Sequence, residues 1–129
     1  MNAGVEMTYH VDRFYAAVAT LAGDGHIKQR LIRAYQDNLA EIEDDDLPVD
    51  LREPFADLKK RMYCVAPLNG EGPVKASVRK MSVTEASDCS KSIVSLYSEV
   101  LKRADDIQEP LPLDTEEPRV PPFLVKSVS

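Results

Sequence analysis

The chain has 129 residues, of which 29% are charged, and its formal net charge is −6. A chain of this length corresponds to one domain and can bury enough surface to form a core without disulfide bonds. The negative charge argues against nonspecific binding to nucleic acid, which depends on Lys and Arg that neutralise phosphates.

The cysteine content and the apolar runs indicate the compartment. Two cysteines, Cys64 and Cys89, are too few for a disulfide framework. No cationic segment followed by an apolar run opens the sequence, so we expect no signal peptide. No apolar run approaches the roughly 20 residues that span a bilayer. We therefore expect a cytoplasmic protein that has reduced cysteines and does not enter the membrane.

The charges are unevenly distributed along the chain. Residues 59–81 contain six basic groups and one acidic group. Residues 1–58 contain five basic and twelve acidic groups, and residues 105–129 contain two basic and six acidic groups. The basic segment 59–81 is therefore flanked on both sides by acidic sequence.

Residues 1–9 are expected to form a loose lead-in, and residues 10–104 a helical domain. Apolar residues recur at intervals of three and four in two stretches, which predicts two amphipathic helices on either side of Gly23-Asp24-Gly25. The stripes are Val11, Phe14, Tyr15, Val18, Leu21 and Ala22, and then Ile27, Leu31, Ile32, Tyr35, Leu39 and Ile42. Asp24 is the expected N-cap of the second helix. Because the connection is short, the two helices should pack as an antiparallel hairpin.

The acidic segment Glu43-Asp44-Asp45-Asp46 is expected to form a solvated turn after the hairpin. It lacks the glycine and the terminal glutamate of an EF-hand loop at the required spacing, so a calcium site is a weak interpretation. A third helix follows, with Leu51, Phe55, Leu58 and Met62 on its apolar face. Pro54 is best tolerated in a first turn, which places the start of this helix near residues 50–54.

Residues 73–81 fit two patterns. Val74, Ala76 and Val78 alternate as in a strand, whereas Val74, Val78 and Met81 lie on one helical face. Pro73 suits the first position of a helix. A short helix is therefore preferred over a strand.

The segment Ser82-Val83-Thr84-Glu85 is a capping box, which marks the start of a long helix. Its apolar face contains Ala86, Cys89, Ile93, Leu96, Tyr97, Val100, Leu101 and Ala104. We expect this helix to be the central packing element. Its serines, at positions 87, 90, 92, 95 and 98, are interpreted as a surface of small side chains that permits close helix contact.

Residues 105–129 contain five of the nine prolines and are expected to form an extended Pro-rich acidic tail. Apolar residues in the tail suggest that it wraps around its own bundle or a neighbouring copy. Its Pro118-Arg119-Val120-Pro121-Pro122 segment has a P-x-x-P core that polyproline-binding domains recognise, but an intramolecular contact is the preferred interpretation.

One group of residues is a candidate site for an anionic or phosphorylated ligand. Lys75, Arg79 and Lys80 precede the predicted helix start at Ser82, where free N–H groups and the helix dipole favour negative charge. The glycine spacing matches neither a P-loop nor a dinucleotide fingerprint. The competing interpretation pairs these cations with the acidic turn or the acidic tail.

Catalytic and metal-binding patterns are weak. His10 and His26 are the only histidines, and neither has a second metal ligand at helical spacing. Cys64 follows Lys59-Lys60-Arg61 and is the one candidate nucleophile, which ranks last among the hypotheses. We expect no cofactor, no metal and no catalytic residue.

The sequence thus predicts a mainly α fold, a small helical bundle with an extended C-terminal tail. The preferred function is that of a non-catalytic adaptor or regulatory protein that binds other proteins and self-associates as a homodimer. The alternative is a regulatory protein that binds an anionic ligand at Lys75, Arg79, Lys80 and Ser82.

Overall fold

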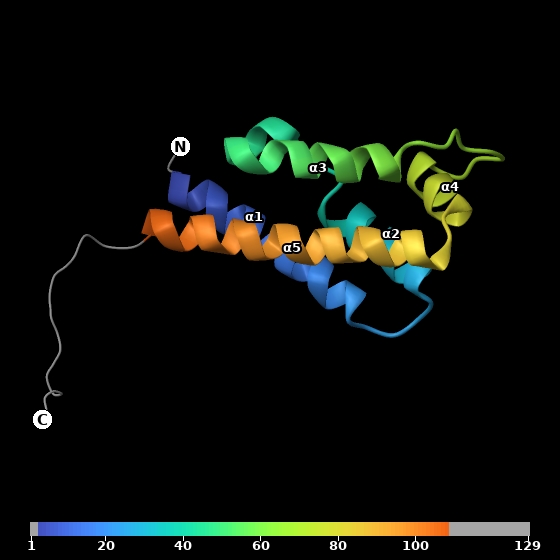
Figure 1. The fold of residues 1–129 in the computed structure, drawn as a ribbon, viewed down its shortest axis with the longest axis horizontal. Coiled ribbons are helices and arrows are strands. Elements are labelled where there is room, and N and C mark those ends of the chain that lie inside the picture. The colour runs from blue at the N-terminus through green and yellow to red at the C-terminus, as the bar shows by residue number, and fades with distance from the viewer. Residues whose placement is uncertain (1–2, 109–129) are drawn as a thin grey trace, which may run out of the picture.

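The computed structural model describes residues 3–108, which form five α-helices and no strand (Figure 1). The elements are α1 (Ala3–Leu21), α2 (Ile27–Asn38), the short 3₁₀ helix η1 (Asp44–Asp46), α3 (Val49–Met62), α4 (Pro73–Lys80) and α5 (Val83–Gln108). The mainly α bundle predicted from the sequence is confirmed.

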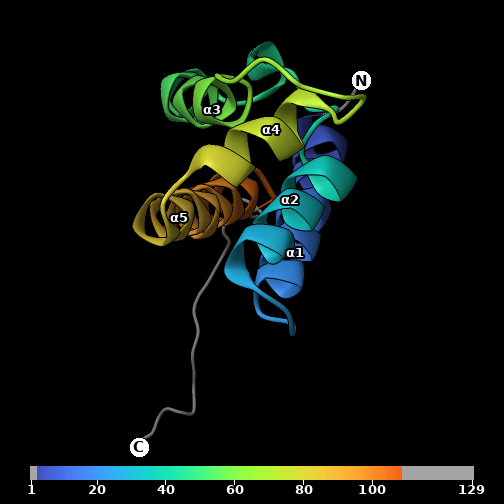
Figure 2. The same ribbon diagram turned by 90° about the vertical axis from the view of Figure 1, so that its right-hand side faces the viewer.

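Helix α5 is the central element of the bundle, as predicted. It packs most extensively on α1 and also contacts α2 and α3. Figure 2 shows α1 and α2 together on one side of α5, with α3 on another side. The short helix α4 packs against both α2 and α3, near the start of α5. The start of α1 and the end of α5 lie at the same end of the molecule (Figure 1).

Helices α1 and α2 form the predicted antiparallel hairpin. The Arg30 guanidinium near the start of α2 donates to the carbonyl of Leu21 at the end of α1. Arg13 of α1 donates to the side-chain oxygen of Asn38, where α2 ends, over 2.7 Å. The tight turn between the helices requires Gly25, whose φ of 102° is strained for other residues.

The core joins all the helices. Phe14 of α1 and Phe55 of α3 are fully buried and meet edge to face, with their ring centroids 6.0 Å apart. Tyr35 of α2 and Ile93 of α5 are also fully buried. The four apolar residues predicted for α3 are all buried, as are Leu31, Tyr35, Leu39 and Ile42 of the second predicted stripe.

The prediction for the N-terminus was wrong. Helix α1 begins at Ala3, so residues 3–9 are helical and do not form a loose lead-in. Met7 and His10 are buried and continue the stripe of Phe14 one turn earlier than expected. Among residues 6–9 only Met7 is buried, so a single apolar position marks this part of the helix in the sequence.

Three further details differ from the sequence interpretation. The N-cap of α2 is His26, whose Nδ1 accepts from the N–H of Lys28 over 3.1 Å, and not Asp24. Helix α3 begins at Val49, so Pro54 lies inside the helix, beyond the first turn. Tyr15 lies outside the core, with 58% of its surface exposed.

Residues 73–80 are helical, which confirms the preferred interpretation over a strand. Pro73 occupies the start of α4, where its missing N–H has no helical partner to lose. Val74 and Val78 face the core together with Ser77.

Helix α5 ends at Gln108, four residues beyond the expected end of the helical domain at residue 104. The rest of the predicted tail, including the segment Pro118–Pro122, lies outside the described residues.

Candidate functional site

Arg79 of α4 contacts the loop that precedes this helix. The Arg79 guanidinium donates to both carboxylate oxygens of Glu71, over 2.6 Å and 3.3 Å. These hydrogen bonds lower the pKa of Glu71 and raise the pKa of Arg79. The carbonyl of Arg79 also accepts from the ammonium of Lys28 over 3.2 Å. Arg79 is therefore engaged by a neighbouring acid and is not presented alone to a ligand.

The Ser82 end of the candidate site is occupied by the capping box. The Ser82 hydroxyl accepts from the N–H of Glu85 over 3.0 Å, and the Glu85 carboxylate accepts from the N–H of Ser82 over 2.8 Å. Both interactions agree with the sequence prediction. Their consequence for anion binding is unfavourable, because Glu85 places its own negative charge at the start of α5.

Lys75 and Lys80 differ in that only Lys80 lines a hollow. Both are exposed, and within residues 3–108 neither forms an ion pair. Lys80 lines an open hollow of about 360 Å³, whose lining does not include Lys75, Arg79 or Ser82. The four predicted site residues are therefore not gathered around one cavity.

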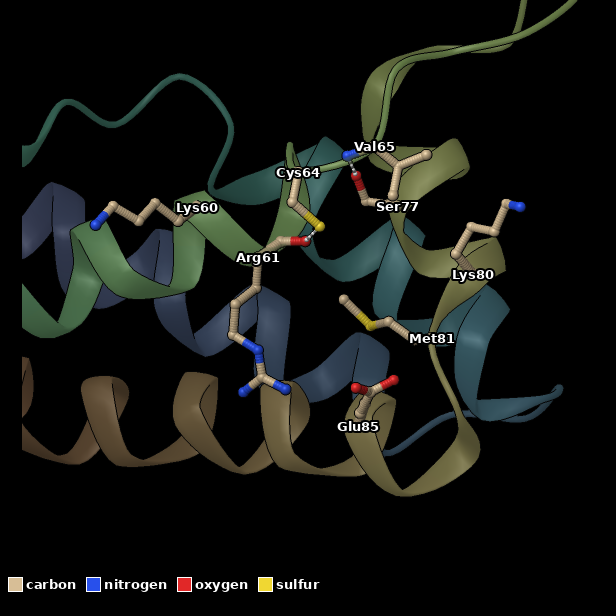
Figure 3. A pocket seen from close by; sticks show the side chains of 8 residues that line it. All are labelled: Lys60, Arg61, Cys64, Val65, Ser77, Lys80, Met81 and Glu85. Atoms are coloured by element: carbon tan, nitrogen blue, oxygen red, sulfur yellow. Dashed lines mark hydrogen bonds between the residues drawn. The ribbon is translucent and has the colours of Figure 1, made fainter.

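This hollow brings together α3, α4 and the start of α5 (Figure 3). It is lined by Lys60, Arg61, Cys64, Val65, Ser77, Lys80, Met81 and Glu85. Figure 3 shows Lys60 and Lys80 pointing away from each other on opposite sides of the hollow, while Arg61 reaches toward α5. The cations therefore do not converge on a single point.

Sequence reasoning missed that Lys60 and Arg61 line the same hollow as Lys80. The run Lys59-Lys60-Arg61 is visible in the sequence, and the structure places it in the last turn of α3. The local sequence does not show how the last turn of α3 packs relative to α4.

The two cysteines differ in environment. Cys64 is exposed, lines the hollow and donates its thiol to the carbonyl of Arg61 over 3.4 Å. Cys89 is fully buried on α5, and burial raises the pKa of its thiol. No histidine lines the hollow, and the carboxylate in its lining is Glu85, which accepts from the N–H of Ser82 in the capping box.

Within the described residues no group of three His, Cys, Asp or Glu side chains can hold a metal ion. His10 is buried beside the ring of Tyr9, with a centroid distance of 5.4 Å, and His26 serves as a helix cap. Both histidines thus have structural positions on the hairpin.

The acidic turn is tied to the adjacent helix. Lys59 of α3 lies 3.5 Å from the carboxylate of Asp44, and Arg52 donates to the carbonyl oxygens of Asp45 and Leu47. The cation that pairs with the acidic turn is thus Lys59. Among the three cations for which such a partner was considered, Lys75, Arg79 and Lys80, Arg79 pairs with Glu71 of the loop before α4.

Comparisons with protein-family models, with curated proteins and with solved structures returned no match. The candidate functions therefore depend on the surface of this chain alone. None of its described helices is long and apolar enough to cross a bilayer.

An apolar surface lies along the contact between α1 and α5. Val11, Tyr15 and Val18 lie on one side of α1, and Val94, Tyr97 and Leu101 on one side of α5. We call these six residues the α1–α5 face. The rings of Tyr15 and Tyr97 lie 6.1 Å apart, so the two helices contribute to one continuous surface.

Much of this face is exposed to solvent. The exposed fractions are 58% for Tyr15, 46% for Val94 and 36% for Leu101. Val11, Val18 and Tyr97 are half-buried against the core. Sequence reasoning assigned Tyr15 and Leu101 to core faces, because helical periodicity does not distinguish a buried stripe from an apolar stripe at the edge of the core.

A second surface lies between α3 and α5. Leu51, Pro54 and Leu96 line a hollow of about 280 Å³ together with Ser92 and Ser95. Two of the serines predicted to permit close helix contact therefore border an open groove. Its rim is charged, with Asp88, Lys91 and Glu99, which makes it less suited to an apolar partner than the α1–α5 face.

Proposed function

We propose that this chain is a non-catalytic, cytoplasmic protein-interaction protein that self-associates through the α1–α5 face. The observation that supports the proposal is the continuous apolar surface around the Tyr15 and Tyr97 rings. Exposed aromatic and aliphatic residues that form one patch are typical of protein-binding surfaces.

A second copy of the chain is the proposed partner because the face has few charges. Each copy carries a net charge of −6, so two copies repel each other over most of their surfaces. The six residues of the α1–α5 face carry no charge. In a two-fold symmetric dimer the same patch of each copy meets its counterpart. The α1–α5 face has three apolar residues on each of two helices, so two copies of it can pack apolar side chains against each other.

The anionic-ligand alternative has weaker support. Arg79 is paired with Glu71, and Glu85 occupies the start of α5. Lys60 and Lys80 line one hollow, but their side chains diverge (Figure 3). A phosphorylated ligand would have to compete with both carboxylates.

Sedimentation equilibrium of the full chain tests the proposed self-association. The double variant Tyr15→Ser/Leu101→Ser should weaken the dimer at least tenfold in Kd, because it removes two exposed apolar anchors from the face. Leu68→Ser is the matched control, since Leu68 is as exposed as Tyr15, at 58%, but lies in the loop before α4. A wild-type chain that stays monomeric at millimolar concentration, or a double variant that associates like the control, would refute the proposal.

A further inference from the structure

The loop between α3 and α4 contains a tight turn. The carbonyl of Leu68 accepts from the N–H of Glu71 over 3.0 Å, which closes a four-residue turn around Asn69 and Gly70. Both central residues have a positive φ, 52° for Asn69 and 81° for Gly70. This is the pattern of a type I′ turn, for which Asn-Gly is a favoured pair. Figure 1 shows the loop projecting from the bundle beyond α4.

The two groups of this turn that can react with each other are accessible. Asn69 and Gly70 are both exposed. Within residues 3–108 neither the side-chain amide of Asn69 nor the N–H of Gly70 forms a hydrogen bond. Gly70 has no side chain to shield its nitrogen, and no atom lies within 4 Å of the position that a Cβ would take. The amide carbon of Asn69 is thus followed by an unhindered nitrogen.

We propose that Asn69 is a modification site, at which the amide is converted to aspartate and isoaspartate without an enzyme. The nitrogen of Gly70 loses its proton to base and bonds to Cγ of Asn69. The bond from Cγ to Nδ2 breaks, and ammonia leaves a five-membered succinimide. Water then opens the ring, at Cγ to give aspartate or at the main-chain carbonyl to give isoaspartate. One water is consumed and one ammonia is released.

The ion pair between Glu71 and Arg79 regulates this reaction by holding the turn closed. In a type I′ turn the main chain directs the second central nitrogen away from the first side chain, so the ring can form only when the turn opens. The Glu71 carboxylate accepts from the N–H of Leu68 over 3.3 Å and from Arg79 over 2.6 Å. It therefore ties the start of the turn to the end of α4, and loss of Arg79 increases the open fraction.

The products change the surroundings of Arg79. Asn69 and Arg79 line one hollow of about 300 Å³ together with Glu71. Aspartate at position 69 adds a second carboxylate to this hollow. Isoaspartate adds one main-chain carbon inside the turn, which changes the geometry that the hydrogen bond between Leu68 and Glu71 requires. None of these steps involves the α1–α5 face, so the site does not depend on the proposed self-association.

Mass spectrometry of the full chain after prolonged incubation at neutral pH tests the proposed site. Each conversion replaces an amide NH₂ by a hydroxyl, which raises the mass by about 1 Da. Peptide mapping should place this gain at Asn69. Asn38 is the internal control, because its side-chain amide is hydrogen-bonded to Arg13 and Ala34. The bulky Leu39 follows it, so its mass should not change.

Three variants separate the chemistry from the opening of the turn. Asn69→Gln should gain no mass at this position, since its longer side chain would have to close a six-membered ring. Arg79→Gln should accelerate the conversion about two- to fivefold, the change in population that one surface ion pair supports. Lys80→Gln removes an equal charge without contacting Glu71, and it should react at the wild-type rate.

Two results would overturn the proposal. A wild-type chain in which Asn69 gains no more mass than Asn38 would show that position 69 is not a modification site. Equal rates in the Arg79→Gln and Lys80→Gln chains would show that the ion pair does not regulate the reaction.

Discussion

The ion pair between Arg79 and Glu71 is the best-defined electrostatic contact of the basic segment. Two hydrogen bonds from one guanidinium to both oxygens of one carboxylate fix the geometry more strongly than a single point charge does. The contact holds the loop before α4 against the end of that helix. It also explains why a cation predicted to bind a ligand is engaged within the chain.

The pair makes the titration of Glu71 a direct test of the structure. Arg79→Gln should raise the pKa of Glu71 toward its ordinary value of 4.5, because the hydrogen bonds that lower it are lost. Carboxyl-carbon NMR titration of the full chain measures this change. Lys80→Gln is the control, since Lys80 does not contact Glu71, and it should leave the titration unchanged.

The sign of the pH effect follows from the lowered pKa. Because the folded chain binds the Glu71 proton less tightly than the unfolded chain, the pair contributes stability above pH 4.5 and loses that contribution as the pH falls through the folded pKa. A Glu71 pKa that does not respond to Arg79→Gln would show that the pair does not persist in solution.

At the scale of elements, the start of α5 is the most clearly encoded feature. The capping box satisfies two N–H groups that have no partner within the helix. It also separates α4 from α5, because Met81 and Ser82 leave the helical path between the two helices. A continuous helix there would prevent α4 from reaching both α2 and α3.

Ser82→Ala should lower the free energy of unfolding by about 1 kcal/mol, since alanine cannot accept the N–H of Glu85. Urea denaturation monitored by circular dichroism measures the loss. Ser98→Ala is the matched control, because Ser98 is exposed within α5, where alanine favours the helix. Equal effects of the two substitutions would argue against the capping role.

The elements could largely be predicted because their signals are local. Pro73 at a helix start, the Ser82–Glu85 box and the stripe of α3 each depend on residues within one or two turns. Residues 3–9 of α1 were missed, although the buried stripe continues from Phe14 through His10 to Met7. Its position in the core depends on packing that the local sequence does not contain.

At the scale of the whole molecule, two adjacent residues of α1 have opposite roles. Phe14 is fully buried against Phe55, whereas Tyr15 is mostly exposed on the α1–α5 face. Both were assigned to one apolar stripe, because a periodic pattern shows which residues share a helix face but not which other element packs against each of them. The same limit applied to the candidate site, where Lys80 lines a hollow with Lys60 and Arg61 that the other predicted site residues do not line.

Phe14→Ala should lower the free energy of unfolding of the monomer by about 3–5 kcal/mol, because it leaves a cavity in the core. Tyr15→Ala should change it by less than about 0.5 kcal/mol at concentrations where the chain is monomeric. If Phe14→Ala does not fold, Phe14→Leu should lower it by about 1 kcal/mol. Similar losses at positions 14 and 15 would contradict the placement of the two rings.

The packing of α1 on α5 joins the first and the last helix of the bundle. A ribosome releases α1 long before α5 has been made, so the buried side of α1 stays uncovered during most of synthesis. We therefore expect the bundle to close only after translation has passed Gln108. Chains that stop before α5 should expose Phe14 and become substrates for chaperones and proteases.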